Sequence, residues 1–185
     1  ARGWLRWQGR AELPRVAGCA DWYAGKRDPL PPALLERPVA NPFAHLDTKA
    51  IPNFTSGTCL TIENQFRANQ NVTWQPYETN GGRARCGRTL QLTGNDVLTL
   101  LPGTHYIWEQ SIRLQGGTLR CPTCTNGAGV TIVLTGSPAN IGSIDINGGA
   151  ATSGLRAPLN PADAAYKGVL LWRDGRATSG GNGGN

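Results

Sequence analysis

Five cysteines have the clearest capacity for chemistry in this chain: Cys19, Cys59, Cys86, Cys121 and Cys124. Cys121 and Cys124 have the CxxC spacing, which suits a disulfide, a reduced structural pair, half of a zinc site or a redox pair. Zinc would need two further ligands at matching spacing, but the two histidines, His45 and His105, are isolated. A redox site would need a helix after the motif, and a Gly-rich turn follows instead. We therefore expect a disulfide between Cys121 and Cys124.

Cys59 and Cys86 form the natural second pair, which leaves Cys19 without a partner. Two disulfides would place the protein in an oxidising compartment, so we expect it to be exported to the periplasm or cell surface. The sequence has no run of 18 or more apolar residues and does not open on a signal peptide. Any export signal or membrane anchor is therefore expected upstream of Ala1.

Paired carboxylates would offer a second kind of chemistry, because glycoside hydrolysis needs two of them about 5 to 10 Å apart. The candidates in the repetitive part of the chain are Asp96, Glu109, Asp145 and Asp174. Neither an Asp-Asp pair nor a metal-ligand run accompanies them, so we expect solvated side chains, and the same for His105. The chain also lacks a nucleophile elbow and a phosphate-binding or dinucleotide loop. The sequence predicts no catalytic residue, cofactor or metal site.

The composition indicates the kind of fold that must hold these side chains. Of the 185 residues, 39% are apolar and only 16% are charged, against about 25% in a typical soluble domain. With 25 Gly and 13 Pro, the chain is a poor candidate for a helical bundle and favours β structure rich in turns. The net charge of +6 comes mainly from scattered arginines, so a nucleic-acid partner is not expected.

A short repeat makes the prediction of β structure more specific. The segments Leu90–Asn95, Ile112–Gly117 and Ile144–Gly149 share the order apolar, any, apolar, polar, Gly, then Asn or Gly. Each is followed by a second strand led by Gly, in Gly103–Trp108, Gly129–Leu134 and Gly168–Trp172. Apolar residues two apart point to one side of a strand, and Gly allows a positive φ at the corner that follows.

One such repeat cannot bury its apolar side alone, so successive copies must stack on one another. The fold that we predict is a right-handed parallel β-helix, an all-β solenoid; the alternative is an antiparallel β-sandwich. Residues 1–55 hold seven of the 13 prolines and should form an irregular arm or linker. The repeat domain would span 56–175, and the Gly/Asn-rich segment 176–185 would continue into further strands.

The same segments resemble the C-terminal region of TadG-like proteins of bacterial Tad (tight adherence, Flp-type) pilus loci. The resemblance rests on a collinear series of matches: Cys86-Gly87, Leu101–Ile107, Gly129–Gly136, Ile144–Ala150, Ala157–Pro161 and Tyr166–Asp174. Their order and spacing agree over roughly residues 55 to 180. The segment of Cys121 and Cys124 replaces a Gly-rich linker of the family, and the first 50 residues match nothing in it.

The resemblance implies an exported, membrane-anchored protein of the cell envelope, associated with pilus assembly and without known chemistry. We therefore expect a non-enzymatic structural or interaction module, pilus-associated or adhesive; the alternative is a carbohydrate-active enzyme or a glycan-binding β-helix. Its partners would be envelope or pilus proteins, a glycan, or a second copy bound at the open end of the solenoid. The residues expected to offer contacts are Trp74, Arg83, Arg85, Arg88, Trp108 and Trp172.

Overall fold

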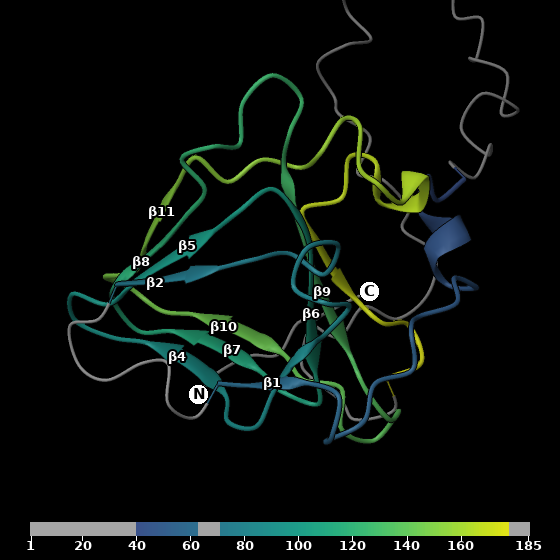
Figure 1. The fold of residues 1–185 in the computed structure, drawn as a ribbon, viewed down its shortest axis with the longest axis horizontal. Helices are drawn as coiled ribbons and strands as arrows, with labels where there is room; N and C mark the ends of the chain where they lie inside the picture. The colour runs from purple at the N-terminus through teal and green to yellow at the C-terminus, as the bar shows by residue number, and fades with distance from the viewer. Residues whose placement is uncertain (1–39, 63–70, 178–185) are drawn as a thin grey trace, which may run out of the picture. The chain divides into compact units, whose positions relative to one another are not determined.

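The structure is a computed structural model that describes residues 40–62 and 71–177 (Figure 1). The chain divides into two compact units, Ala1–Ala40 and Asn41–Asn185, and all described strands belong to the second. In the described ranges strands dominate, and the helices are two short 3-10 helices, η2 (Ala44–Leu46) and η3 (Ala164–Tyr166). The prediction of an all-β fold is confirmed for the described residues. The expected arm lies mostly outside them.

Nine of the strands form three consecutive triplets, and each triplet contributes one strand to each of three sheets. The first triplet is β4 (Leu90–Leu92), β5 (Val97–Leu100) and β6 (Gly103–Trp108). The second is β7 (Ile112–Leu114), β8 (Thr118–Arg120) and β9 (Val130–Thr135). The third is β10 (Ile144–Ile146), β11 (Ala151–Ser153) and β12 (Leu171–Arg173).

The strands of one triplet lie beside the equivalent strands of the next. Sheet A has the order β1-β3-β6-β9-β12, sheet B has β11-β8-β5-β2, and sheet C has β10-β7-β4. The strands that precede the first triplet are β1 (Leu60–Thr61), β2 (Asn71–Trp74) and β3 (Arg85–Cys86). Every strand pair among the described residues is parallel. The antiparallel sandwich, our alternative, does not fit these pairings.

The sequence repeat predicts the register of sheet C correctly. Leu90 and Ile144 both pair with Ile112, and Leu92 and Ile146 both pair with Leu114, so the three copies are stacked residue for residue. In sheet A the Gly-led strands are offset, since Gly103 pairs with Val130 and not with Gly129. The strands of sheet B form a third group that the sequence repeat does not predict.

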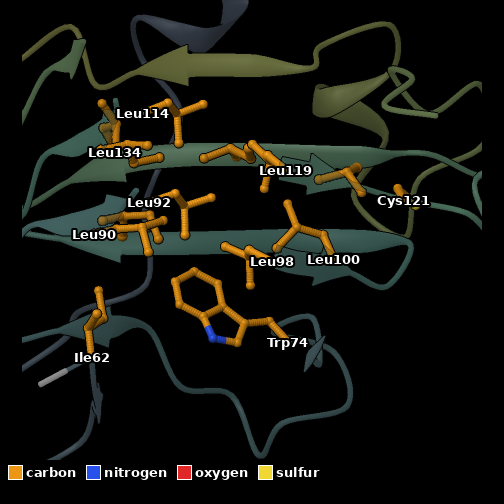
Figure 2. Packing of buried hydrophobic residues seen from close by; sticks show 14 of the residues in the cluster. Ile62, Trp74, Leu90, Leu92, Leu98, Leu100, Leu114, Leu119, Cys121 and Leu134 are labelled. Atoms are coloured by element: carbon orange, nitrogen blue, oxygen red, sulfur yellow. The ribbon is translucent and has the colours of Figure 1, made fainter. Parts of the chain in front are cut away.

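The three sheets enclose one apolar core (Figure 2). It contains the inward-pointing residues of the first two triplets, including Leu92, Leu98 and Leu114, each at most 2% exposed. Figure 2 shows Ile62 and the indole of Trp74 at one edge of this cluster, beyond Leu90 and Leu98. Alternation along each strand explains the pattern, because apolar residues two apart lie on one face.

Burial stops at the third triplet. Ile146 is 60% exposed and Leu171 is 47% exposed, although their partners in the second triplet, Leu114 and Ile132, are 2% and 7% exposed. Thr152 is also exposed, whereas its partner Leu119 is buried. Among the described strands, β10, β11 and β12 are each the last in their sheet. The final triplet therefore leaves these three inward positions exposed, whereas its inward residues Ile144 and Arg173 are half-buried.

Glycine is required where the corners of two triplets approach one another. Gly117 has a φ of +66°, and a Cβ at this position would lie 2.6 Å from the carbonyl oxygen of Asp96 in the preceding triplet. Any side chain would therefore be strained and would also collide with backbone. The Gly shared by the copies of the repeat is its neighbour Gly116, where a Cβ would lie 2.8 Å from the backbone nitrogen of the equivalent Gly94.

Two disulfide-bonded pairs are present, and both are the expected ones. The disulfide between Cys59 and Cys86 links the segment just before β1 with strand β3, and its Cα atoms are 5.9 Å apart. Cys121 and Cys124 close a local loop between β8 and β9, with Cα atoms 5.4 Å apart. Cys19 lies outside the described residues. Within the described parts of the chain, no helix is long and apolar enough to cross a membrane.

Candidate functional site

Sheet A is covered on both faces, and hollows lie on its outer face. A second apolar cluster, which includes Leu46, Phe54, Tyr106, Val133 and Tyr166, packs there against β6 and β9. Figure 1 shows the two short helices on one side of β6 and β9, with sheets B and C on the other. The covering segments do not close the face completely, so cavities remain between them and the strands.

The largest of the described cavities lies at the carboxyl ends of β6 and β9 and has a volume of about 440 Å³. We call it the Trp108 pocket. Its lining includes an aromatic ring and several polar side chains: Asn53, Trp108, Glu109, Thr135, Ser137 and Arg176. A concave site that combines apolar surface with a few fixed polar groups is the usual form of a small-molecule site.

Glu109 adopts a backbone conformation that is rare for a side chain of its type. Its φ is +56°, the left-handed region that residues other than Gly seldom occupy. The backbone N–H of Glu109 donates to the Thr135 carbonyl at 2.8 Å. Its carboxylate oxygen Oε1 accepts from the Ser137 N–H at 3.1 Å and from the Ser137 hydroxyl at 2.6 Å. These contacts fix the Glu109 side chain at the wall of the pocket.

Arg176 reaches the same pocket and is held by a buried carboxylate. Asp174 is 3% exposed and accepts hydrogen bonds from the Arg176 guanidinium and from the Thr135 hydroxyl, the latter at 3.0 Å. Burial alone would raise the pKa of Asp174, but the hydrogen bonds from Arg176 and Thr135 outweigh it and lower the pKa. Asp174 therefore stays ionised and serves to position Arg176.

A second cavity of about 420 Å³ lies beside tyrosines on the same face. Ile51 and Pro52 line both cavities, and Tyr77 and Tyr106 line only this one. The two tyrosine rings meet edge to face with their centroids 5.1 Å apart. Burial raises the pKa of Tyr106 to about 12, so its hydroxyl remains protonated. This cavity is apolar in character and offers fewer fixed polar groups.

An ion pair closes the second cavity at one side. Asp163 caps η3 by accepting from the Ala165 N–H at 3.0 Å, and it also pairs with Lys49. Burial would raise the pKa of Asp163, but the contacts with Lys49 and Ala165 lower it. The ammonium of Lys49 also lies 5.0 Å from the centre of the Tyr166 ring. These contacts attach the segment before β1 to the loop that precedes β12.

Two of the six residues expected to offer surface contacts are buried. Trp74 is 2% exposed and Arg85 is 7% exposed, and the Arg85 guanidinium lies 4.8 Å from the Trp74 ring. Both point to the inner side of the sheets, where burial lowers the pKa of Arg85 to about 10. Their expected role as surface contacts is therefore wrong. The residue types of Trp74 and Arg85 do not predict that these side chains close the core next to Ile62.

The other four expected contact residues lie elsewhere. Arg83 and Arg88 are exposed in the turns on either side of β3. Trp108 and Trp172 are half-buried against the outer cluster of sheet A, and only Trp108 lines the pocket. The arginines and the tryptophans therefore do not form one surface, and the structure brings Trp108 together with Glu109 and Arg176 instead.

The four carboxylates expected in solvent divide into two kinds. Asp145 is exposed and forms an ion pair with Arg113, its Oδ2 lying 3.6 Å from Nε, and Glu109 is half-buried. Asp96 and Asp174 are both 3% exposed, so the expectation of solvated side chains is wrong for them. Asp96 accepts from the backbone N–H and hydroxyl of Thr93 and fixes the corner between β4 and β5.

His105 is also buried, at 3% exposed, where a polar surface residue was expected. Its Nε2 lies 2.8 Å from the Leu101 carbonyl oxygen. Burial is the main reason that the pKa of His105 is lowered to about 4, so the ring is neutral at pH 7. The described residues contain no group of three or more His, Cys, Asp or Glu side chains placed to hold a metal ion.

Of the polar residues that line the Trp108 pocket, four were not identified from the sequence: Asn53, Thr135, Ser137 and Arg176. Asn53 belongs to a segment that was interpreted as an irregular arm. Ser137 and Arg176 each follow a strand of sheet A, β9 and β12. Because the carboxyl ends of neighbouring parallel strands meet at one edge of a sheet, the residues that follow these strands can be predicted to lie close together.

No protein-family model and no solved structure matches the chain. A stretch of 34 residues, 18% of the chain, is 56% identical to a protein named "Probable inorganic carbon transporter subunit DabA" from Dechloromonas aromatica (strain RCB). This match covers 3% of that protein. So short a likeness places the chain in no family and carries no argument about its activity.

Proposed function

We propose that this protein is a non-enzymatic structural and interaction module of the bacterial cell envelope, associated with pilus assembly or adhesion. Its scaffold would be a right-handed parallel β-helix, in which each triplet is one coil. Two features support this scaffold: each triplet adds one strand to every sheet, and all described pairs are parallel. The right hand follows from the strong preference of parallel crossover connections.

Placement in the envelope is supported by the disulfides and by the resemblance to TadG-like pilus proteins. Disulfides such as Cys59–Cys86 persist in oxidising compartments and are rare in the cytosol. A carbohydrate-active enzyme is the less favoured alternative. Hydrolysis of a glycoside needs a carboxylic acid that donates a proton, and Asp174 is ionised and hydrogen-bonded to Arg176 and Thr135.

The observation that carries the interaction role is the uncovered end of the third triplet. We call it the open end and define it by the exposed inward positions Ile146, Thr152 and Leu171. Three parallel strands that have no further described strand beside them, next to exposed apolar side chains, form a surface that favours association.

We propose that a second copy of this chain occupies the open end. The opposite end of the stack is closed, because Ile62 and Trp74 lie over the core there and are 4% and 2% exposed. Head-to-tail stacking on that end is therefore disfavoured, and we propose that the second copy covers the open end with its own open end. Such a contact is self-complementary and gives a closed dimer, not a filament. Envelope or pilus proteins would then bind elsewhere, on the outer face of sheet A.

Sedimentation velocity across a range of protein concentrations tests this proposal. We expect a monomer–dimer equilibrium that shifts at least tenfold toward monomer in Ile146→Lys and in Leu171→Lys. The matched control is Leu159→Lys, because Leu159 is 57% exposed but belongs to a loop outside the stack. A monomer at every concentration would contradict the proposal, as would equal association of all variants.

A further inference from the structure

The Trp108 pocket has the features of a preorganised binding site. Hydrogen bonds fix two of its polar side chains: Ser137 donates to Glu109, and Arg176 donates to Asp174. A side chain that is already fixed loses little conformational freedom when a ligand binds, which favours affinity. Because Oε1 of Glu109 receives both contacts from Ser137, its other oxygen remains to accept hydrogen bonds from a ligand.

The strained backbone of Glu109 is a second, independent sign of function. A non-Gly residue at positive φ persists only where the surrounding structure imposes it, and such residues concentrate at binding sites. Gly136 makes room for this arrangement, since a Cβ at this position would lie 2.6 Å from Cγ of Glu109. The fold therefore places this carboxylate beside Trp108 at an energetic cost.

The charges of the pocket restrict the kind of ligand. The positive charge of Arg176 is balanced by the buried carboxylate of Asp174, so Glu109 leaves the site with one net negative charge. Phosphate, sulfate and carboxylate ligands are disfavoured next to Glu109. A ligand with an apolar face for Trp108 and several hydroxyl groups for Glu109, Asn53 and Arg176 matches both properties.

We infer that the Trp108 pocket binds a neutral saccharide. A pyranose ring presents a C–H face that would pack on Trp108, and its hydroxyls would donate to Glu109 and accept from Asn53 and Arg176. The volume of about 440 Å³ lies within the range typical of small-ligand sites. The pocket binds the sugar without cleaving it, because Glu109 has no second free carboxylate among the residues that line it.

This inference rests on the interaction role proposed above and gives it a ligand class, but it does not depend on the open end. Isothermal titration with the full chain would use a panel of trisaccharides of glucose, galactose, mannose and N-acetylglucosamine. We expect at least one to bind, with affinity reduced more than tenfold in Trp108→Ala and in Glu109→Gln. Trp172→Ala is the matched control, since Trp172 is half-buried on the same face but outside the pocket.

Glu109→Gly distinguishes a loss of saccharide binding from a loss of the folded structure. Gly tolerates the positive φ, so this variant should keep the far-ultraviolet circular dichroism spectrum of the wild type and still lose binding more than tenfold. The inference is overturned if no neutral trisaccharide binds, or if Trp108→Ala binds as well as Trp172→Ala. Binding of a uronic acid trisaccharide in preference to the neutral panel would also overturn it, since that contradicts the charge argument. The sedimentation result is independent of all these outcomes.

Discussion

The two edge strands of sheet C show how differently the two ends of the stack are built. β4 and β10 have the same pattern of apolar residues, and both pair with β7 in parallel. Leu92 of β4 is nevertheless 0% exposed, whereas Ile146 of β10 is 60% exposed. The strand sequences do not cause this difference. It follows from what lies over each strand: Ile62 and Trp74 lie over the core beside β4, whereas Ile146 of β10 is left exposed.

The closed end illustrates how a stack of parallel strands can be terminated. A large indole covers the core, the guanidinium of Arg85 lies against it, and the Cys59–Cys86 disulfide joins the last two strands of sheet A. Charged and bulky groups at the end of a sheet also prevent further strands from pairing there. At the open end Arg173 of β12 takes the position that pairs with Leu134, and its guanidinium donates to the Gly142 and Ile141 carbonyls, but Ile146, Thr152 and Leu171 remain exposed beside it.

Removal of the indole that covers the closed end should have the largest effect. We expect Trp74→Ala to lower the free energy of unfolding by about 4 kcal/mol, because a fully buried aromatic side chain is lost and a cavity remains. Urea denaturation measures this change. Trp172→Ala is the comparison, and an equal loss in both variants would show that Trp74 has no special role.

The two disulfides should differ in their contribution to stability. In the chain-entropy model, the Cys59–Cys86 bridge, with a sequence separation of 27, contributes about 3.5 kcal/mol. The Cys121–Cys124 bridge, with a separation of 3, contributes about 1.5 kcal/mol. Urea denaturation of the two double Cys→Ala variants would test the ranking. A reversed order would mean that the local bridge, not the bridge at the closed end, stabilises the stack.

Truncation of a side chain at equivalent positions should lower the free energy of unfolding less in the third triplet than in the second. Leu114→Ala removes a buried side chain and should cost about 3 kcal/mol. Ile146→Ala changes a residue that pairs with Leu114 but is mostly exposed, so its cost should stay below about 1 kcal/mol in the monomer. Denaturation at low protein concentration gives both values. Equal costs would contradict an uncovered third triplet.

Acidification should weaken the stack through His105. Because burial lowers its folded pKa to about 4 from an ordinary 6.5, the unfolded chain binds more protons between these two pH values. Stability should therefore fall by roughly 2 kcal/mol between pH 7 and pH 4.5. His105→Gln keeps a donor for the Leu101 carbonyl and cannot titrate, so unfolding curves at the two pH values should show a smaller difference. An unchanged difference would exclude His105 as its source.

Asp174 should act in the same direction at lower pH. Its folded pKa is lowered, so its stabilising effect is complete above the unfolded pKa and is lost as the pH falls through the folded value. Asp174→Asn should remove the part of the acid sensitivity that lies below about pH 4. Comparison of Asp174→Asn with His105→Gln separates the contribution of Asp174 to acid sensitivity, beside the third triplet, from that of His105 in β6.

The sequence predicted the parts of the fold that repeat. Two apolar residues separated by one polar residue identified β4, β7 and β10 with their exact register. The repeat does not predict the strands of sheet B, because their inward residues differ between triplets. The position of Leu98 and Leu119 in the first two triplets is taken by Thr152 in the third. Periodicity detects only what each copy preserves.

Burial of polar side chains was the least predictable feature. Residue type suggests that Arg85, His105 and Asp174 lie in solvent, and only three-dimensional contacts reveal the partners that compensate their burial. The Trp108 pocket was predicted only in part for a similar reason. It combines Asn53 with residues that follow three different strands of sheet A, and the sequence does not place the segment of Asn53 over that sheet.

Amide hydrogen exchange of β4 and β10 tests most directly whether the two ends differ as described. Among the described strands both are edges of one sheet and pair with β7, and the burial of their side chains distinguishes them. In dilute protein, the amides of β10 should exchange much faster than those of β4, and they should slow as rising concentration drives two open ends together. Equally slow exchange of both strands in dilute protein would contradict the open end and the association that depends on it.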